Sequence, residues 1–199
     1  MNRPGKAWVV LVGIIVGILV VLLLIGTSVF SWYTGNYNRV VRLDESVKQS
    51  WSDVEAQLQR RFELVPNLVA TVKGYADHEK DLFENIAKSR ENYFQGKSPQ
   101  DKMAASNQMS GLLSRLLVLQ ERYPDLKANQ GFRDLQAQLE GTENRIAVAR
   151  TRYNAIVREL NSYRRSFFGG YFADKTDVTA ASPFEASEQA KIEVPKVEF

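Results

Sequence analysis

The most apolar stretch of the chain lies near its start. No charged residue occurs between Lys6 and Arg39, and the run AWVVLVGIIVGILVVLLLIG fills positions 7–26. At about 1.5 Å of helical rise per residue, such a run crosses a hydrocarbon core of about 30 Å. Trp8 lies at one end of the run and Trp32 follows the other, as aromatic side chains do at the two headgroup levels of a bilayer. The pattern predicts a transmembrane helix.

A cleaved signal peptide is the alternative for this segment. Signal peptides have a shorter apolar region and a cleavage site with small residues, and the run here is longer and lacks a convincing A-x-A site. We therefore expect an uncleaved anchor over residues 1–34. Arg3 and Lys6 precede the span, whereas the basic residues that follow it are mixed with acids. Acidic residues count for little in the positive-inside rule, so the charge bias is small, and it favours a single-pass protein of the inner or plasma membrane with its body outside the cytoplasm.

After the anchor, apolar residues recur every three or four positions, which predicts helices and not strands. The last of these apolar seams should form one helix of about 36 residues. Its members are Phe132, Leu135, Leu139, Thr142, Ile146, Ala149, Tyr153, Ile156, Leu160, Tyr163 and Phe167. The pattern stops at Gly169 and Gly170, where we expect the helix to have ended.

An earlier seam leaves two readings open. It comprises Val47, Trp51, Val54, Leu58, Arg61, Val65, Leu68, Val72, Tyr75, Glu79, Leu82, Ile86, Ser89 and Tyr93. Because its phase survives Pro66 and Gly74, it predicts one long helix with a kink at Pro66. Alternatively, the chain reverses at Gly74–Asp77, with Gly74 as a C-terminal cap and Asp77 as a new N-cap.

A middle helix has clear boundaries. Ser98 can cap its start, Pro99 fits the first helical position, and Asp101 stands three residues after the cap. Its end is expected at Tyr123–Pro124, because the residue before a proline avoids helical backbone.

These segments predict an all-α protein. We expect an N-terminal transmembrane helix followed by an up-and-down bundle of long antiparallel helices, with three long or four shorter segments. The expected domains are the anchor at residues 1–34, the bundle at residues 35–172, and an extended, largely disordered tail at residues 173–199.

Composition removes several classes of function. The chain has no cysteine and one histidine, His78, so one chain offers no disulfide, no thiolate nucleophile and no multi-histidine metal site. A net charge of +3 is too small to indicate nucleic-acid binding. The triplet Asp77-His78-Glu79 cannot converge on one ion from a single helix. We found no catalytic motif, and we expect no enzyme, no cofactor and no metal.

Four stretches of the sequence are distinctive: YNRVVRLDESVKQSW, QRRFELVPNLVATVKGYADHEK, YPDLKANQGFRDLQAQLEGTENRIAVARTRYN and the terminal PFEASEQAKIEVPKVEF. Together they resemble the LemA family. The resemblance covers residues 37–168 and 183–199. It implies an N-terminal membrane segment, an up-and-down helical bundle and a family whose biochemical activity is poorly established. Some relatives resemble lipoproteins, with a cysteine where this chain has Gly35-Asn36, so a lipid anchor is excluded here.

The most specific parts of this resemblance supply candidate structural or interaction residues. They are Arg60, Arg61, Pro66 and Asn67 in the earlier seam, and Glu143, Asn144, Arg150, Tyr153 and Asn154 in the TENRIAVARTRYN block. Arg61 occupies an apolar seam position, where an unpaired charge is costly. We expect it either to pair with Glu140 or Glu143 and so fix the helix register, or to extend its side chain to water.

The end of the last helix is basic and aromatic. Its arginines indicate either a solvated face or a contact with anionic lipid headgroups. If the chain reverses near Gly74, this end meets the membrane, and the candidate membrane contacts are Arg164, Arg165, Phe167 and Phe168. The terminal Val197-Glu198-Phe199 has the shape of a C-terminal recognition motif, so Val197 and Phe199 are further candidates.

The sequence favours a membrane-anchored helical scaffold or interaction protein of the bacterial cell envelope. The alternatives are a membrane-binding or membrane-shaping protein that uses the end of the last helix and, as the weakest reading, an enzyme. The expected partners are membrane lipids through the anchor, with a second copy of the chain or an envelope protein as further candidates and no nucleic acid.

Overall fold

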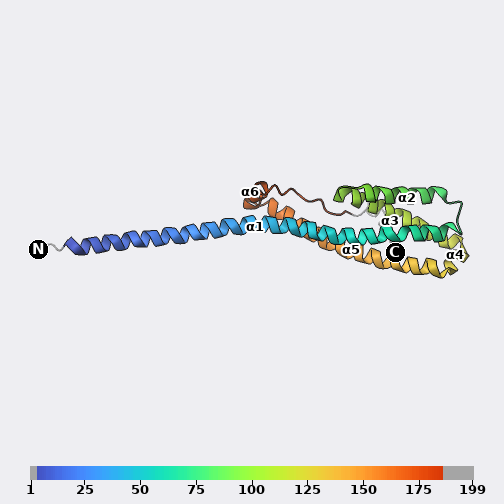
Figure 1. Ribbon diagram of the computed structural model, residues 1–199, viewed down its shortest axis with the longest axis horizontal. Coiled ribbons are helices and arrows are strands. Elements are labelled where there is room, and N and C mark those ends of the chain that lie inside the picture. The colour runs from blue at the N-terminus through green and yellow to red at the C-terminus, as the bar shows by residue number, and fades with distance from the viewer. Residues whose placement is uncertain (1–3, 186–199) are drawn as a thin grey trace, which may run out of the picture. The chain divides into compact units, whose positions relative to one another are not determined.

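A computed structural model describes residues 4–185, with side chains from Trp8 onward. Its elements are α1 (Pro4–Lys73), α2 (Lys80–Gln95), α3 (Pro99–Arg122), α4 (Pro124–Ala128), α5 (Gln130–Arg164) and α6 (Phe167–Lys175) (Figure 1). The described part of the chain contains no strand. The all-α prediction is confirmed.

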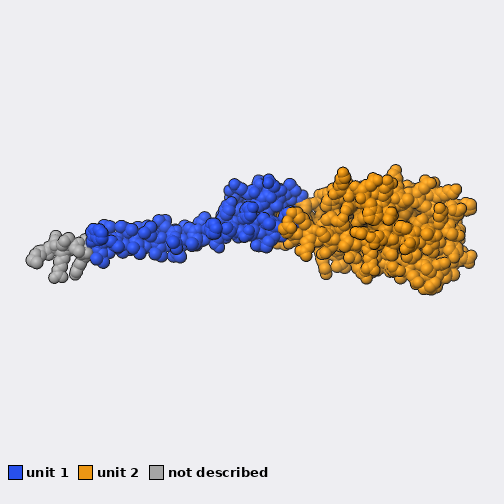
Figure 2. All heavy atoms as spheres, in the orientation of Figure 1, with its two compact units in different colours: residues 1–44, 161–180 blue, residues 45–160, 181–199 orange. Residues whose placement is uncertain are grey.

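The chain divides into two compact units (Figure 2). Unit 1 comprises residues 1–44 and 161–180, and unit 2 comprises residues 45–160 and 181–199. In unit 2, the later part of α1 packs with α2, α3 and α5 as an up-and-down bundle of four segments (Figure 1). Helix α4 is a short addition that the sequence did not predict, and it follows α3 directly because Pro124 suits a first helical turn.

The core of unit 2 lies between these four segments. It consists mainly of aliphatic side chains, and at its centre the rings of Phe62 and Tyr93 stack with centroids 4.1 Å apart and an interplanar angle of 15°. Fully burying a side chain such as Leu58 or Met109 stabilises a fold by about 1.5–3 kcal/mol.

The chain reverses after α1, which decides between the two readings of the earlier seam. Helix α1 ends at Lys73, and the amides of Tyr75 and Ala76 both donate to the carbonyl of Val72. Two details of the expected reversal are wrong. Gly74 does not have the positive φ of a glycine cap, and Glu79, not Asp77, occupies the N-cap position of α2.

The middle helix begins and ends as predicted. The Ser98 hydroxyl accepts from the Asp101 amide at 3.1 Å, and the Ser98 amide donates to the Asp101 carboxylate at 3.2 Å. These two bonds form the reciprocal capping box that the spacing indicated. They also hold the pKa of Asp101 below its usual value.

The last helix ends earlier than its seam suggested. Helix α5 stops at Arg164, and Ser166 caps a separate helix, α6, by accepting from the Gly169 amide at 3.1 Å. Gly169 and Gly170 lie inside α6 and do not end a helix. A Cβ at position 169 would overlap the Tyr163 carbonyl, so this glycine allows α6 to start close against the end of α5.

Beyond α6 the described chain is not helical. Residues 176–185 carry no helix, and Phe184 is buried in unit 2 although it falls within the expected tail. Residues 186–199 lie outside the described part, and with them the candidate C-terminal motif of Val197 and Phe199.

Candidate functional site

Unit 1 gathers aromatic side chains where α1 leaves its apolar run. The Trp32 ring meets Phe168 at 5.0 Å and Phe172 at 5.9 Å between centroids, and Tyr33 meets Phe172 at 5.1 Å, all edge to face. We call Trp32, Tyr33, Phe168 and Phe172 the aromatic foot. Pairs of this geometry stabilise by about 0.5–1.5 kcal/mol beyond their buried area.

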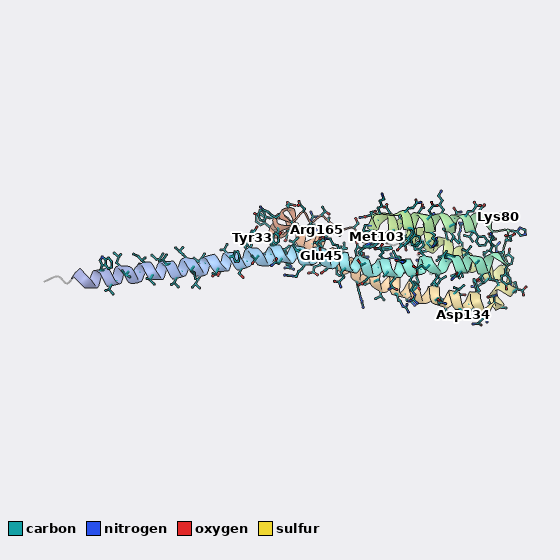
Figure 3. All side chains as sticks on the ribbon, viewed as in Figure 1. Tyr33, Glu45, Lys80, Met103, Asp134 and Arg165 are labelled. Carbon is teal, nitrogen blue, oxygen red and sulfur yellow. The ribbon has the colours of Figure 1, made fainter. Side chains whose placement is uncertain are left out.

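The surface around the aromatic foot is unusually apolar. Phe167 is 87% exposed, and Phe168 and Tyr171 are each more than half exposed. The side chains of α1 from Trp8 to Phe30 are also exposed throughout, as Figure 3 shows. Within residues 8–185, α1 is the one helix that is long and apolar enough to cross a membrane. Continuous apolar surface of this kind marks a contact with lipid or protein.

Basic and polar groups flank the aromatic foot. The Arg39 guanidinium lies over the Tyr163 ring, 4.7 Å from its centroid, and the Tyr163 hydroxyl donates to Asn36 Oδ1 at 2.9 Å. Arg164 Nε is buried without a hydrogen-bond partner among the described residues, and Arg165 is exposed. The candidate membrane contacts Arg164, Arg165, Phe167 and Phe168 therefore belong to one unit.

A second site lies in unit 2, where helices α3 and α5 hold the segment 182–185. The Asn154 side chain makes two hydrogen bonds to the main chain of Phe184. Its Oδ1 accepts from the Phe184 amide at 2.7 Å, and its Nδ2 donates to the Phe184 carbonyl at 2.9 Å. The Tyr153 hydroxyl donates to the Ser182 carbonyl at 2.9 Å. We call the five side chains that hold this segment the tail clamp: Gln100, Asn107, Arg150, Tyr153 and Asn154.

Arg150 makes the broadest contact of the tail clamp. Its guanidinium lies 4.1 Å from the centroid of the Phe184 ring and donates to the Glu185 carbonyl at 3.1 Å. Asn107 Nδ2 donates to the same carbonyl, and Gln100 Nε2 donates to the Ser182 hydroxyl at 3.1 Å. Phe184 is only 2% exposed as a result.

An ion pair between the buried Arg61 and the half-exposed Glu143 lies next to the tail clamp. Arg61 Nη1 lies 3.0 Å from Glu143 Oε2, and Arg61 Nη2 donates to Ser110 Oγ at 3.0 Å, which joins α1, α5 and α3. The Arg61 side chain is 6% exposed, so it does not reach water. Burial lowers the pKa of Arg61, Glu143 opposes that change, and the charge of Arg150 adds to it. Burial also lowers the pKa of Arg150, again against Glu143.

The structure thus brings together five of the candidates from the sequence, namely Arg61, Glu143, Arg150, Tyr153 and Asn154. Arg60, Pro66, Asn67 and Asn144 are exposed and lie outside this cluster. Sequence reasoning missed the other half of the site, which includes Gln100, Asn107, Ser110 and the segment around Phe184. An aromatic residue after a proline in a polar tail was the one local signal for it.

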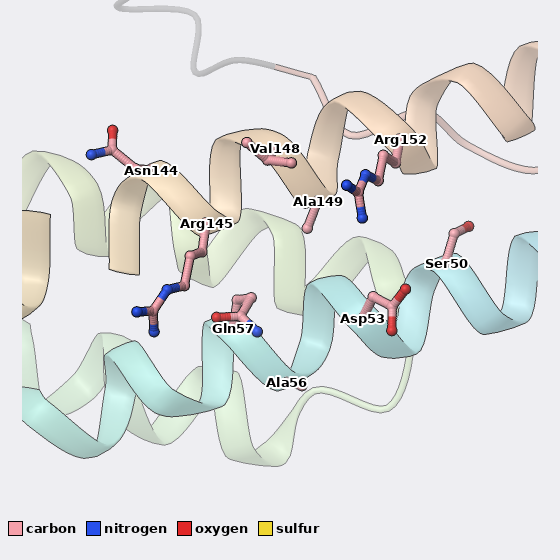
Figure 4. A pocket seen from close by; sticks show the side chains of 9 residues that line it. All are labelled: Ser50, Asp53, Ala56, Gln57, Asn144, Arg145, Val148, Ala149 and Arg152. Atoms are coloured by element: carbon pink, nitrogen blue, oxygen red, sulfur yellow. The ribbon is translucent and has the colours of Figure 1, made fainter. Parts of the chain in front are cut away.

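Asn144 instead lines a groove between α1 and α5 (Figure 4). The groove holds about 480 Å³, and its walls carry Asp53 and Gln57 from α1 and Arg145 and Arg152 from α5. Its floor is made of small and apolar side chains. The described residues contain no group of three or more His, Cys, Asp or Glu side chains that could hold a metal ion.

Comparison with known proteins identifies the family of this chain. The sequence model of the LemA family matches residues 50–199. Protein LemA of Metamycoplasma hominis is 25% identical over 185 residues, covering 92% of this chain and 83% of the relative. Magnetosome protein MamQ 2 of Paramagnetospirillum magneticum is 24% identical over 175 residues, covering 75% of this chain and 64% of the relative. The chain thus spans less than two thirds of that longer relative.

Proposed function

This chain belongs to the LemA family, and from that premise we propose that it is a membrane-anchored helical scaffold of the bacterial cell envelope. Membrane association itself follows from the exposed apolar segment of α1. In the proposed arrangement, residues 1–34 anchor the chain, residues 35–172 form the body, and residues 173–199 form a tail that serves contacts with other proteins.

The observation that carries the proposal is the aromatic foot. Aromatic side chains with one polar edge favour the headgroup level of a bilayer, and Trp32 and Tyr33 stand just beyond the apolar run of α1. Their contacts with Phe168 and Phe172 tie α6 to that level of the anchor. The chain is therefore attached to the lipid surface at two separate points of its sequence, α1 and α6. Two points of attachment fix the orientation of the helical body on the membrane.

Unit 2 supports the scaffold role through its chemistry. Its polar groups are engaged in helix caps, the ion pair of Arg61 and Glu143, and the tail clamp. None of these groupings is arranged as a nucleophile with a base, so we propose that the protein acts by binding and not by catalysis. The exposed residues Arg60, Asn67 and Asn144 are proposed to face partners.

The alternative function is a membrane-binding or membrane-shaping protein that acts through α6. The exposure of Phe167, Phe168 and Tyr171 favours it, because apolar side chains at the headgroup level wedge between lipids. In that case α6 would carry the membrane affinity, and the apolar part of α1 would not need to span.

Extraction of membranes with alkaline carbonate separates the two functions. The scaffold proposal expects the full chain to stay in the membrane pellet, and expects Val16→Arg with Val20→Arg to release it, since charges at the bilayer centre are costly. The triple variant Phe167→Ser, Phe168→Ser, Tyr171→Ser should remain in the pellet. Release of the triple variant, with retention of the double arginine variant, would support the alternative.

A separate experiment tests on which side of the membrane the body lies. Arg3 and Lys6 support a cytoplasmic N-terminus and a body outside the cytoplasm, in the inner membrane. A protease added to cells with a permeable outer envelope but an intact inner membrane should then digest the body. Protection until the inner membrane is lysed would reverse the proposed orientation.

A further inference from the structure

The tail clamp binds its segment through the segment's main chain. Its hydrogen bonds go to the Ser182 carbonyl, the Phe184 amide and carbonyl, and the Glu185 carbonyl, and only Gln100 bonds to a side chain. Pro183 disfavours helical backbone at Ser182 and so helps to keep the segment extended. Main-chain bonds give affinity for an extended peptide, and the burial of one aromatic ring gives selectivity.

We propose that the tail clamp is a binding site for an extended peptide segment, and that its occupant in the assembled scaffold is the segment 182–185 of a second copy of this chain. The inference rests on the proposed function in one respect, because a common membrane brings the copies together. It adds a ligand and a mode of assembly to that function.

The clamp residues belong to the helices and not to the segment that they hold. Asn154 and Arg150 stand one helical turn apart on α5, and Asn107 stands on α3. Glu143, which is paired with Arg61, lies near Arg150 and opposes the effect of burial on the pKa of Arg150. Helices and the ion pair thus hold the binding groups in place, and the occupant is a separable part.

The chain between α6 and the clamp has the features of an exchange hinge. Val178 is buried in unit 1 and Phe184 is buried in unit 2, while Thr179 and Ala180 between them are exposed. Asp177, just before this stretch, has a φ of 53°, a left-handed conformation that is uncommon for a residue other than glycine. Short and strained hinges favour the exchange of an element between identical chains.

Exchange between copies preserves every contact of the clamp, because the incoming segment is identical to the outgoing one. The remaining cost is that of bringing two chains together, and a shared membrane lowers it by fixing their orientation and raising their effective concentration. At about 3.3–3.6 Å per extended residue, the short hinge reaches only a bundle in direct contact. The exchange therefore links neighbouring copies in the plane of the membrane.

Crosslinking between two different chains tests the exchange. The sequence has no cysteine, and Gln100 Nε2 lies 3.1 Å from Ser182 Oγ. Full chains carrying Gln100→Cys with one tag and Ser182→Cys with another are reconstituted together in lipid vesicles and treated with a short bifunctional thiol reagent. We expect a covalent heterodimer that carries both tags. The matched control is Gln108→Cys, an exposed glutamine on the same helix, with the same Ser182→Cys partner.

A heterodimer no more abundant than in the Gln108→Cys control would overturn the exchange, provided that a single chain with both Gln100→Cys and Ser182→Cys crosslinks internally. This result is independent of the carbonate extraction. If the chain stays in the membrane pellet but forms no heterodimer, only the proposed exchange is contradicted. If the chain is extracted but forms the heterodimer, only the proposed anchoring is contradicted.

Peptide binding tests whether the clamp is a site in its own right. A fluorescent peptide with the sequence ASPFEAS, copied from residues 181–187, is titrated into the full chain carrying Phe184→Ala, whose own segment has lost its buried ring. We expect saturable binding by anisotropy, at least tenfold weaker after the further change Asn154→Ala. Absence of binding to the Phe184→Ala chain, or binding that Asn154→Ala does not weaken, would overturn the site.

Discussion

Most of the large apolar side chains of unit 2 are buried, whereas most of those of unit 1 are exposed. Unit 2 buries Phe62, Phe132 and Phe184 almost completely, whereas unit 1 leaves Phe167 and Tyr171 exposed. Unit 2 pairs its buried Arg61 with Glu143, and each unit keeps one buried polar atom without a hydrogen-bond partner among the described residues, Gln57 Oε1 in unit 2 and Arg164 Nε in unit 1. Unit 2 covers most of its own apolar surface, and unit 1 leaves most of its apolar surface to be covered by its surroundings.

The difference shows where each unit draws its stability. A bundle that buries its aromatic rings and pairs its buried charge is stabilised in water by its own packing. A helix with exposed apolar side chains beside an aromatic cluster is stabilised by lipid. Substitutions in unit 2 should therefore change the stability of the fold, and substitutions in unit 1 should change contact with the membrane.

The largest effect should come from Arg61→Glu. This change buries a carboxylate next to the half-exposed Glu143, and an uncompensated buried charge costs about 3 kcal/mol or more. The Tm of the purified chain, followed by circular dichroism in detergent, should fall by about 10 °C. Adding Glu143→Arg should recover part of the loss, and Arg61→Met should cost less, because the half-exposed Glu143 remains solvated. An unchanged Tm for Arg61→Glu would contradict the role of the pair.

Phe184→Ala and Phe167→Ala compare the two units at the same residue type. Removing the buried Phe184 ring should weaken its segment by about 2–3 kcal/mol, mostly as local release and not global unfolding. The amide at position 184, which donates to Asn154 Oδ1, should then exchange hydrogen much faster, as mass spectrometry of the peptide that contains it would show. Phe167→Ala should leave exchange and Tm in detergent unchanged. Equal effects of the two variants on the fold would remove the distinction between the units.

Charge at unit 1 should affect the choice of lipid. If Arg164 and Arg165 contact anionic headgroups, each contributes about 1 kcal/mol, or about fivefold in association. The double variant Arg164→Gln, Arg165→Gln should lose its preference for spin-labelled phosphatidylglycerol over phosphatidylcholine, measured by electron spin resonance. Arg145→Gln with Arg152→Gln in unit 2 is the matched control and should keep the preference. A preference that survives the unit 1 change would favour the solvated reading of these arginines.

The smallest effect should be a loss of stability of unit 2 at alkaline pH. Burial raises the pKa of Tyr93 well above its usual value, with further increases from Glu55 and Glu63, and burial raises the pKa of Tyr153. The folded state favours the neutral phenols, so this contribution is complete below about pH 10 and is lost as pH rises further. At pH 10.5 the loss should be about 0.8 kcal/mol for Tyr93. Tyr93→Phe should flatten the decline of Tm with pH, and an unchanged slope would contradict it.

Local signals predicted much of the fold. The spacing of Ser98, Pro99 and Asp101 identified the start of α3 because a capping box depends on neighbours in sequence. The apolar periodicity continued through the reversal after α1, so periodicity alone did not locate this reversal. The residue buried after Val72 is Ala76, whereas Tyr75, which continued the seam, is exposed in the turn. Gly169 suggested a helix end, yet it allows a close helix contact that only tertiary structure reveals.

The sequence predicted the candidate site only where a charged residue at an apolar position required a partner of opposite charge. Arg61 stood out because a charge on an apolar seam requires compensation, and Glu143 was one of two carboxylates considered for it. The tail clamp had no such signal, because Asn154 meets Phe184 across 30 positions of sequence. The asparagine and the phenylalanine look ordinary by themselves, and their relation is set by packing.

Depth-resolved fluorescence quenching tests the contrast between the units most directly. Chains in which Trp32 or Trp51 is the single tryptophan are reconstituted in vesicles whose lipids carry bromine at chosen depths. We expect strong quenching of Trp32 by bromine near the headgroups and no quenching of Trp51, which packs against Tyr153 inside unit 2. Quenching of Trp51 equal to that of Trp32, or none of either, would contradict the distinction between a lipid-supported unit 1 and a self-contained unit 2.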